Sequence, residues 1–312
     1  MDPCHDTASR GPASLRAAEY PRPEHYLVHL SDTHFVLPGD RLGGVVDCED
    51  RLTALVSALE ATGVPPEAII VSGDLADRGE PAAYRWLRAV LEPAAQRIGA
   101  QMIWVMGNHD RREAMYQHLL GDTPSDDPYD RVVMLGGLRV VVLDSTVPGH
   151  AHGELTADQL GWLRASLEQP APEGSILVMH HPPVPCVQDL AVTVELRDQA
   201  ALAEVLHGSD VRAILAGHLH YSTSATFAGI PVSVAAATCY TQDLFTPGRG
   251  TRGRDAAQSV NLVHVYRHTI MHSVAPLAGG ITVGRHVDVE TTAAMLAAEG
   301  LYIPDRPALA DR

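Results

Sequence analysis

Residues 25–34 read HYLVHLSDTH, an apolar run followed at once by two potential metal ligands, Asp32 and His34. The run at residues 25–30 predicts a buried strand, because it is short, apolar and bounded by polar residues. In an open α/β sheet, the carboxyl ends of the strands lie along one crevice. The stretch therefore predicts a strand that carries two ligands to the edge of a sheet.

Four further apolar runs end in the same way. They lead into Ser72-Gly73-Asp74, Gly107-Asn108-His109-Asp110, His180-His181-Pro182-Pro183 and Gly217-His218-Leu219-His220. Any one of these polar side chains alone would favour a simple cap at a strand end. Five ordered blocks instead favour one shared metal site at the strand ends. The candidate ligands are Asp32, His34, Asp74, Asn108, His180, His218 and His220.

These donors suit some metals better than others. Carboxylate, amide and imidazole groups favour Fe, Mn, Zn or Co and do not form a calcium cage. The set is too large for one tetrahedral ion, but it suffices for two ions that share Asp74. Two ions about 3.5–4 Å apart can hold the attacking and the leaving oxygen of a displacement at phosphorus. A serine nucleophile is not needed, and the sequence has no G-x-S-x-G motif.

Length and composition limit the remaining choices. The 312 residues can hold one large or two modest domains, and 46% hydrophobic residues allow a sizeable core. A net charge of −15 argues against nucleic acid or an anionic membrane as a general partner. The four cysteines form no C-x-x-C pair, so we expect reduced, buried thiols. Residues 1–24 lack the apolar core of a signal peptide, and no run approaches the roughly 18 residues of a membrane-spanning helix. We therefore expect a cytoplasmic protein.

Composition divides the chain into three parts. Residues 1–23 are rich in proline and charge and predict a disordered N-terminal lead-in. Residues 24–278 contain every site block and predict the catalytic domain. Within them, the Gly- and Arg-rich residues 246–258 predict a mobile surface loop, with an anion-attracting flap as the alternative. Residues 279–312 predict a C-terminal appendage with an Ala-rich helix near 289–299.

The blocks D-x-H, G-D, G-N-H-D, H-H-P-P and G-H-x-H, in this order, resemble the calcineurin-like metallophosphoesterases. Residues 72–81 (SGDLADRGEP) and 217–223 (GHLHYST) are similar to the bacterial class III cyclic nucleotide phosphodiesterases. The resemblance implies an α/β fold, a four-layer αββα metallophosphoesterase sandwich in which two mixed β-sheets are flanked by helices. It also implies a homodimer.

The same resemblance implies how the ligands are shared. It assigns Asp32, His34, Asp74 and His220 to one metal, and Asp74, Asn108, His180 and His218 to the other. Each chain would bind two transition-metal ions, with Fe and Mn expected first and Zn or Co as alternatives. In the pair His180-His181, the first is expected to be the ligand and the second a hydrogen-bond donor behind it.

His109 follows the ligand Asn108 and cannot easily bind the same ion. The resemblance implies that His109 protonates the leaving oxygen or stabilises the phosphoryl charge. We hypothesise that the carboxylate of Asp77, three residues after Asp74, orients His109 through a ring nitrogen and shares in catalysis. Asn108, His109 and His220 are expected to contact the substrate.

The implied reaction is hydrolysis of 3′,5′-cyclic AMP, with other cyclic nucleotides, to the 5′-nucleotide. A metal-bound hydroxide would attack phosphorus and the 3′ oxygen would leave. No motif in the sequence indicates recognition of the adenine base, so a broad or 2′,3′-cyclic nucleotide phosphodiesterase is an alternative. An alternative of another class is a metal-stabilised binding protein whose tail after Gly280 contacts a partner or the cell envelope. The tail leaves a peripheral membrane or envelope association open.

Overall fold

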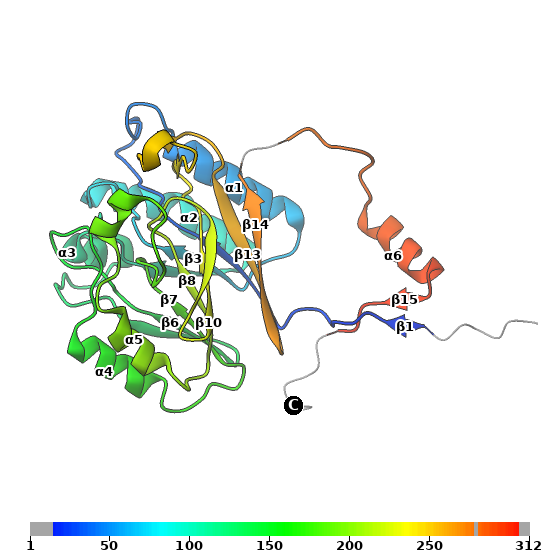
Figure 1. The fold of residues 1–312 in the computed structure, drawn as a ribbon. Coiled ribbons are helices and arrows are strands. Elements are labelled where there is room, and N and C mark those ends of the chain that lie inside the picture. Colours follow the sequence, from blue (N-terminus) through cyan, green and yellow to red (C-terminus); the bar gives the residue numbers. More distant parts are fainter. Residues whose placement is uncertain (1–14, 278–279, 306–312) are drawn as a thin grey trace, which may run out of the picture. The chain divides into compact units, whose positions relative to one another are not determined.

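The structure is a computed structural model that describes residues 15–277 and 280–305. The chain divides into two compact units, and each is described by itself. The larger unit, residues 25–279, contains all five site blocks. In Figure 1 its two sheets lie between helices.

One sheet of the larger unit has five strands in the order β14-β13-β2-β3-β4. They are β2 (His25–Leu30), β3 (Ala68–Ser72), β4 (Gln101–Val105), β13 (Ser259–Tyr266) and β14 (Thr269–Pro276). β2, β3 and β4 run parallel, whereas β13 and β14 are antiparallel to their neighbours. Helices α1 (Cys48–Thr62) and α2 (Pro81–Ile98) connect the parallel strands. The sheet is therefore mixed, as predicted.

The other sheet has six strands in the order β5-β6-β7-β8-β10-β9. They are β5 (Arg131–Leu135), β6 (Leu138–Val142), β7 (Ser175–Val178), β8 (Val211–Ala216), β9 (Thr223–Phe227) and β10 (Ile230–Val234). Its four central strands run parallel, and β5 and β9 pair antiparallel at the two edges. Helices α4 (Ala157–Ser166) and α5 (Gln199–Leu206) lie between its strands in the chain.

Strand β6 shows how the four layers are built, because successive side chains of a strand point to opposite faces. Val140 and Val142 belong to the core shared with the first sheet. Val141 lies in a separate core with Leu163 of α4 and Leu202 of α5. The two sheets thus face each other, with helices on the outer faces. The predicted αββα sandwich is confirmed.

Local signals place the helix ends. Asp47 precedes α1 and accepts a hydrogen bond from the N–H of Asp50, while Gly63 ends the helix in the left-handed conformation at φ 64°. A capping box begins α4, since Thr156 and Gln159 bond to each other's backbone N–H. These caps fix where α1 and α4 begin and where α1 ends.

The remaining elements of the larger unit are short. They are α3 (Arg112–Met115), the π-helix η1 (Tyr116–Leu120), the 3₁₀-helices η2 (Asp189–Val194) and η3 (Pro247–Arg249), β11 (Thr241–Gln242) and β12 (Gly253–Arg254). The structure differs here from the mobile loop predicted at residues 246–258, because β12 pairs with β11. Arg252 and Arg254 both bind the carboxylate of Asp243, so these guanidinium groups are already engaged by a protein anion.

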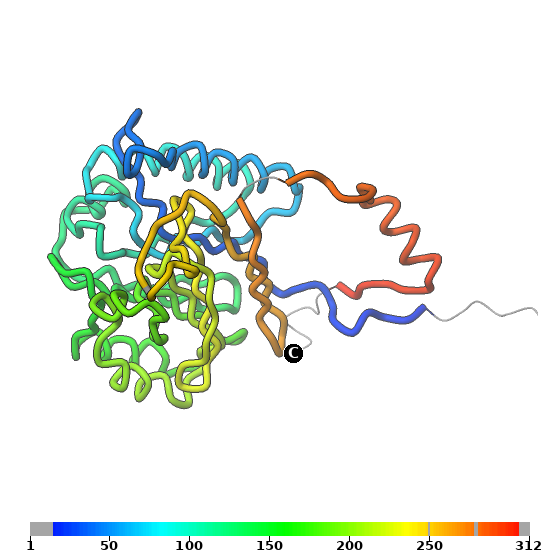
Figure 2. Tube along the Cα trace, turned by 45° about the horizontal axis from the view of Figure 1, so that its top comes forward, coloured from blue at the N-terminus to red at the C-terminus, as the bar shows by residue number. Residues whose placement is uncertain are grey.

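The smaller unit joins residues 1–24 and 280–312. Its strand β1 (Arg16–Ala17) pairs in parallel with β15 (Leu301–Tyr302), so part of the lead-in predicted to be disordered is a strand. Figure 2 shows this blue segment beside the red end of the chain. Helix α6 (Val289–Ala298) confirms the predicted Ala-rich helix, and the lead-in up to residue 14 lies outside the described residues. Within residues 15–277 and 280–305, no helix has the length and apolarity needed to cross a bilayer.

A buried ion pair ties the two sheets together away from the site blocks. His25 of β2 donates to Glu67 Oε2 over 2.8 Å and to Glu173 Oε2, just before β7, over 2.7 Å. Burial alone would lower the pKa of His25, but the hydrogen bonds and charges of both glutamates outweigh it and raise that pKa. Both ring nitrogens face carboxylates, so His25 carries a positive charge.

We expect His25→Leu to lower the free energy of unfolding by about 3 kcal/mol, because both carboxylates lose their contact with the imidazolium. The imidazolium stabilises the fold fully below its ordinary pKa of 6.5, and this contribution disappears as pH rises through the higher folded-state pKa. Urea unfolding should therefore show a wider gap between wild type and variant near about pH 6 than near about pH 9. His207→Leu, at an exposed histidine, is the control. A gap that does not change with pH would contradict a charged His25.

Candidate metal centre

The structure brings the predicted ligands of the first metal together. His34 follows β2, and its Nε2 lies 3.3 Å from Asp74 Oδ2, beyond the end of β3. His34 Nε2 is also 3.2 Å from His220 Nε2, which lies 3.3 Å from Asp32 Oδ1. One donor atom from each of these four side chains lies within 4.8 Å of all the others. They form a single buried cluster at the carboxyl ends of β2, β3 and β8.

The ligands predicted for the second metal adjoin this cluster. His180 Nε2 lies 3.4 Å from Asp74 Oδ2 and 3.2 Å from Asn108 Oδ1. The rings of His180 and His218 have centroids 5.0 Å apart. Asp74 Oδ2 therefore lies between His34 and His180, which is the position that a ligand shared by two ions needs.

Each of the four histidines has one ring nitrogen bound to an acceptor outside the cluster. These pairs are His34 Nδ1 with Asp77 Oδ1 (3.1 Å), His180 Nδ1 with Ser72 O (2.8 Å), His218 Nε2 with Val194 O (2.9 Å) and His220 Nδ1 with Tyr240 O (3.0 Å). Such an acceptor holds the proton on the nitrogen that faces it. The other nitrogen of each ring then carries a lone pair, which is the form that a metal binds.

The cluster therefore brings lone pairs against one another. If both rings are neutral with their protons on Nδ1, neither His34 nor His220 has a hydrogen to place between their Nε2 atoms, so without a metal one ring must take up a second proton. Among the described residues, Asp32 Oδ1 is buried without any hydrogen-bond donor. Such a set of facing acceptors is unfavourable by itself, because buried acceptors need donors or cations. The donor set thus fits metal ions.

Backbone conformation at the ligands supports the same interpretation. Five of the seven predicted ligands have φ in the left-handed region, which non-glycine residues rarely adopt. They are Asp32 (54°), His34 (41°), Asp74 (48°), His218 (70°) and His220 (54°). Each such residue costs about 1–3 kcal/mol and persists only where the surroundings enforce it. The fold accepts this strain to direct the donors inward.

The charge of the carboxylates also suits a cation. Burial opposes ionisation of Asp74, but the nearby imidazoles of His180 and His34 hold its pKa well below the ordinary value. Burial acts in the same way on Asp32, and His220 outweighs it and lowers that pKa. Both carboxylates are therefore ionised within the folded protein, and positive charge beside them, from protonated imidazoles or from metal ions, has to balance them.

His181 differs from its neighbour His180, because both of its ring nitrogens have partners. Nδ1 lies 2.9 Å from Ser145 Oγ, and Nε2 lies 3.2 Å from the carbonyl oxygen of Ala151. Burial, aided by the rings of His218 and His180, lowers its pKa well below the ordinary value, so the ring is neutral. His181 thus holds the loop at residues 145–151 against the ligand cluster. His180 differs because its Nε2 faces the cluster, where it can bind a metal.

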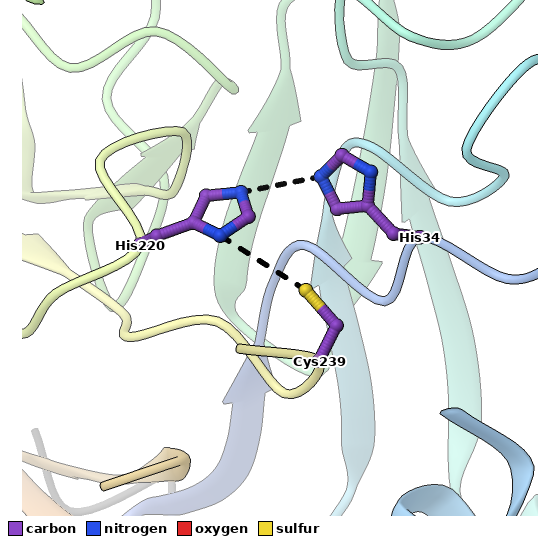
Figure 3. A group of neighbouring side chains, drawn as sticks. All are labelled: His34, His220 and Cys239. Carbon is purple, nitrogen blue, oxygen red and sulfur yellow. Dashed lines mark hydrogen bonds between the residues drawn. The ribbon is translucent and has the colours of Figure 1, made fainter. Parts of the chain in front are cut away.

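Cys239 is a further side chain of the cluster, but its position argues against a role as ligand. Its Sγ lies 4.0 Å from His220 Nδ1, and Figure 3 shows this contact on the opposite side of the ring from His34. Burial raises the pKa of Cys239 well above the ordinary value, so the thiol keeps its proton. Cys239 packs behind His220, as expected for a buried thiol.

The structure corrects the predicted partner of His109. His109 Nδ1 donates to the backbone carbonyl oxygen of Asp77 over 2.7 Å, whereas the Asp77 carboxylate is 3.9 Å away. That carboxylate instead accepts from His34 Nδ1. His109 lies edge-on to His34, with centroids 4.6 Å apart, and its side chain is 41% exposed. It therefore stands at the open side of the cluster, where the expected role requires it.

Several residues that hold the ligands were not predicted. Ser72, Val194 and Tyr240 act through backbone carbonyl oxygens, and side-chain patterns carry no signal for such contacts. Asp110 belongs to a recognised block, but its role was not predicted. Its carboxylate accepts hydrogen bonds from backbone N–H groups of two ligand loops.

An αββα sandwich with aspartate and histidine donors at its strand ends defines a metal-binding phosphoesterase. Residues 25–222 match the family model described as calcineurin-like phosphoesterase. The chain belongs to this family.

Similar proteins extend beyond the matched region. The cAMP/cGMP dual specificity phosphodiesterase of Mycobacterium tuberculosis (strain CDC 1551 / Oshkosh) is 60% identical over 289 residues, which cover 93% of this chain and 91% of that protein. The 3′,5′-cyclic adenosine monophosphate phosphodiesterase of Pseudomonas aeruginosa is 31% identical over 258 residues, with 82% and 89% covered.

Solved structures show the same fold at low identity. A dimetal phosphatase from Danio rerio has a TM-score of 0.57 at 15% identity, covering 82% of this chain and 97% of its own. A purple acid phosphatase from yellow lupin has a TM-score of 0.59 at 13% identity, covering 86% and 55%. At these identities the likeness concerns the fold alone.

A substitution at Gly107 tests how closely the loops that carry Asp74 and Asn108 pack against each other. A Cβ at this position would lie 2.0 Å from the backbone nitrogen of Asp74 and 2.3 Å from its Oδ1. We expect Gly107→Ala to lose most of its bound Mn²⁺ after reconstitution, measured by elemental analysis, because the two ligand loops must separate. Gly161→Ala in α4 is the control, since nothing lies within 4 Å of its Cβ. That change should keep the metal and gain about 0.5–1 kcal/mol of stability. Equal metal content in both variants would contradict the tight packing.

Proposed function

We propose that this protein hydrolyses cyclic nucleotides, 3′,5′-cyclic AMP among them, to the 5′-nucleotide. Two lines of observation support the proposal. The cluster contains every donor that a two-metal phosphodiesterase centre needs, with Asp74 placed between its two halves. The relative from Mycobacterium tuberculosis, a cAMP/cGMP phosphodiesterase by name, is 60% identical over 93% of this chain.

The observation that carries the proposal is the convergence of imidazole nitrogens and carboxylate oxygens, with one such atom from each of four side chains within 4.8 Å of the others. We infer that two transition-metal ions bind there, with Fe and Mn favoured and Zn or Co accepted, because nitrogen and oxygen donors of this kind bind several such ions. When bound, the ions polarise the phosphoryl group and make hydroxide available near neutral pH. Asp32, His34, Asp74 and His220 would hold one ion, and Asp74, Asn108, His180 and His218 the other.

The protein's own residues would then orient the substrate and move a proton. The carbonyl oxygen of Asp77 holds the proton of His109 on Nδ1, which leaves Nε2 as the atom that faces a substrate. A protonated His109 can donate from Nε2 to the leaving 3′ oxygen or to a phosphoryl oxygen. Asn108 and His220 would contact the phosphate. Asp77 would act on catalysis through its two histidine contacts, as a positioning residue.

A panel of substrates tests the proposal. The metal-reconstituted protein should cleave 3′,5′-cyclic AMP with a higher kcat/KM than 2′,3′-cyclic AMP or bis(4-nitrophenyl) phosphate, and chromatography should identify 5′-AMP as the product. A higher kcat/KM for the 2′,3′ isomer would favour the broad or 2′,3′-cyclic alternative. If a sample that contains two metal equivalents leaves every diester intact, the proposed function is wrong.

Substitution of His109 should lower kcat without loss of metal, whereas substitution of Asp77 should weaken metal binding. We expect His109→Ala to lower kcat by about 10²- to 10⁴-fold, the usual worth of a general acid, while it still binds two Mn²⁺ equivalents. Asp77→Ala should instead weaken Mn²⁺ binding about 10- to 100-fold, because His34 loses its acceptor. Asp158→Ala is the matched control, since that aspartate is exposed in α4, away from both histidines. If the loss of rate in His109→Ala only follows a loss of metal, the proton-donor role is wrong.

A second role, contact with a partner or the cell envelope, rests on the smaller unit. Its described residues expose apolar side chains, with Ile281 and Val283 each 95% and Val289 87% exposed. We infer that this tail supplies a contact surface that catalysis does not need. Deletion of residues 280–312 should leave kcat/KM unchanged and reduce co-sedimentation with envelope fractions. The homodimer and the cytoplasmic location stay predictions beside it.

A further inference from the structure

Asp110 joins two loops that carry ligands. It follows His109 in the G-N-H-D block, and its buried carboxylate accepts three backbone hydrogen bonds. Two come from Leu75 and Ala76, each at 3.1 Å, in the loop that begins with Asp74. The third comes from Gly107, at 2.9 Å, in the loop that contains Asn108. One carboxylate therefore fixes both loops relative to each other.

The hydroxyl of Tyr84, in the first turn of helix α2, completes this network. It donates to Asp110 Oδ1 over 2.9 Å and accepts a hydrogen bond from the backbone N–H of Arg111, also at 2.9 Å. The side chain has no exposed surface. From the sequence, Tyr84 is expected only as part of the apolar face of its helix. The structure shows that its polar atom faces the ligand loops.

The two loops are in such close contact that small shifts would reach the ligands. The N–H of His109 donates to Asp74 Oδ1 over 2.9 Å, and Gly107 leaves no space for a Cβ beside Asp74. Asp74 is the donor expected to serve both metals, and Asn108 serves one of them. Metal–ligand distances tolerate deviations of only about 0.2 Å. The network that holds the loops together thus determines whether Asp74 and Asn108 can bind at once.

A phenylalanine substitution separates the packing of the Tyr84 ring from the hydrogen bonds of its hydroxyl. The ring lies in the main hydrophobic core with Leu87 and Leu91 of the same helix, and phenylalanine would keep those contacts. Only the hydroxyl reaches Asp110 and Arg111. Its removal would leave the N–H of Arg111 without this acceptor and Asp110 with one donor fewer.

We propose that Tyr84 is a positioning residue of the metal centre, whose hydroxyl acts through Asp110 to keep the Asp74 and Asn108 loops at metal-binding distance. The inference rests on the metal centre proposed above. It assigns to helix α2 an indirect part in metal binding, through Asp110, although none of its residues is a ligand.

Titration of the metal-free protein with Mn²⁺ by calorimetry tests this role. We expect Tyr84→Phe to bind Mn²⁺ about tenfold more weakly at one of the two sites, as is usual when a group behind a ligand is lost. At saturating Mn²⁺, kcat should still fall about tenfold, because Asp74 and Asn108 no longer hold the two ions at the distance that the reaction needs. Tyr116→Phe is the matched control, since it removes a hydroxyl that bonds to Pro128 O at 3.4 Å, outside the ligand loops.

The outcomes separate the two proposals. If the wild type binds no Mn²⁺, the metal centre itself is wrong. If wild type and Tyr84→Phe bind Mn²⁺ equally and differ only in thermal stability, the hydroxyl merely stabilises the fold and the positioning role is overturned.

A measurement on the unaltered protein covers the case in which the variant does not fold. By hydrogen exchange, the amides of Leu75, Ala76 and Gly107 in the metal-free wild type should be as protected as those in the middle of α2. Rapid exchange at these three amides would overturn the proposal without any substitution.

Discussion

The structure depends on one unfavourable arrangement, the convergence of acceptors in a buried cluster. Asp32 and Asp74 are ionised there, and the Nε2 atoms of His34 and His220 lie 3.2 Å apart. Left-handed backbone at the ligands adds about 1–3 kcal/mol for each such residue. A chain with a stability of about 5–15 kcal/mol tolerates such a cluster only if the rest of the fold enforces it.

The parallel strands are the elements that hold this buried cluster in place. β2, β3 and β4 of one sheet and β7 and β8 of the other each end two or three residues before a ligand, and most of their side chains are buried. Cores on both sides of the second sheet hold the strands in register. The loops after the strands can then adopt strained conformations, because the strain is opposed by long, cooperative sheet contacts.

Much of this could be predicted, because strands and ligands both leave local patterns. The run at residues 25–30 has the composition and length of a buried strand, and each block follows such a run directly. Long-range pairing of short segments leaves no such pattern. The two-residue strand β1 pairs with β15 almost the whole chain away, and β12 pairs with β11 inside a predicted loop.

The supports of the ligands were the least predictable part, since most are backbone atoms. Val194 and Tyr240 hold histidines through carbonyl oxygens, for which the residue type is immaterial. The sequence predicts only that Tyr84 lies on the apolar face of its helix. Periodicity shows which face of a helix is buried but not where a hydroxyl points. The error at Asp77 has a similar origin, since separation in sequence does not tell which of two nearby rings a carboxylate reaches.

That error reveals a coupling within the site. Asp77 binds His34 with its carboxylate and His109 with its backbone carbonyl. One residue thus sets the ring orientation of a predicted metal ligand and of the proposed proton donor. A shift of Asp77 that carried His34 away from Asp74 would also displace His109. The distance between the ligand cluster and the proposed proton donor is therefore set by one short peptide segment, which places the two rings edge-on with centroids 4.6 Å apart.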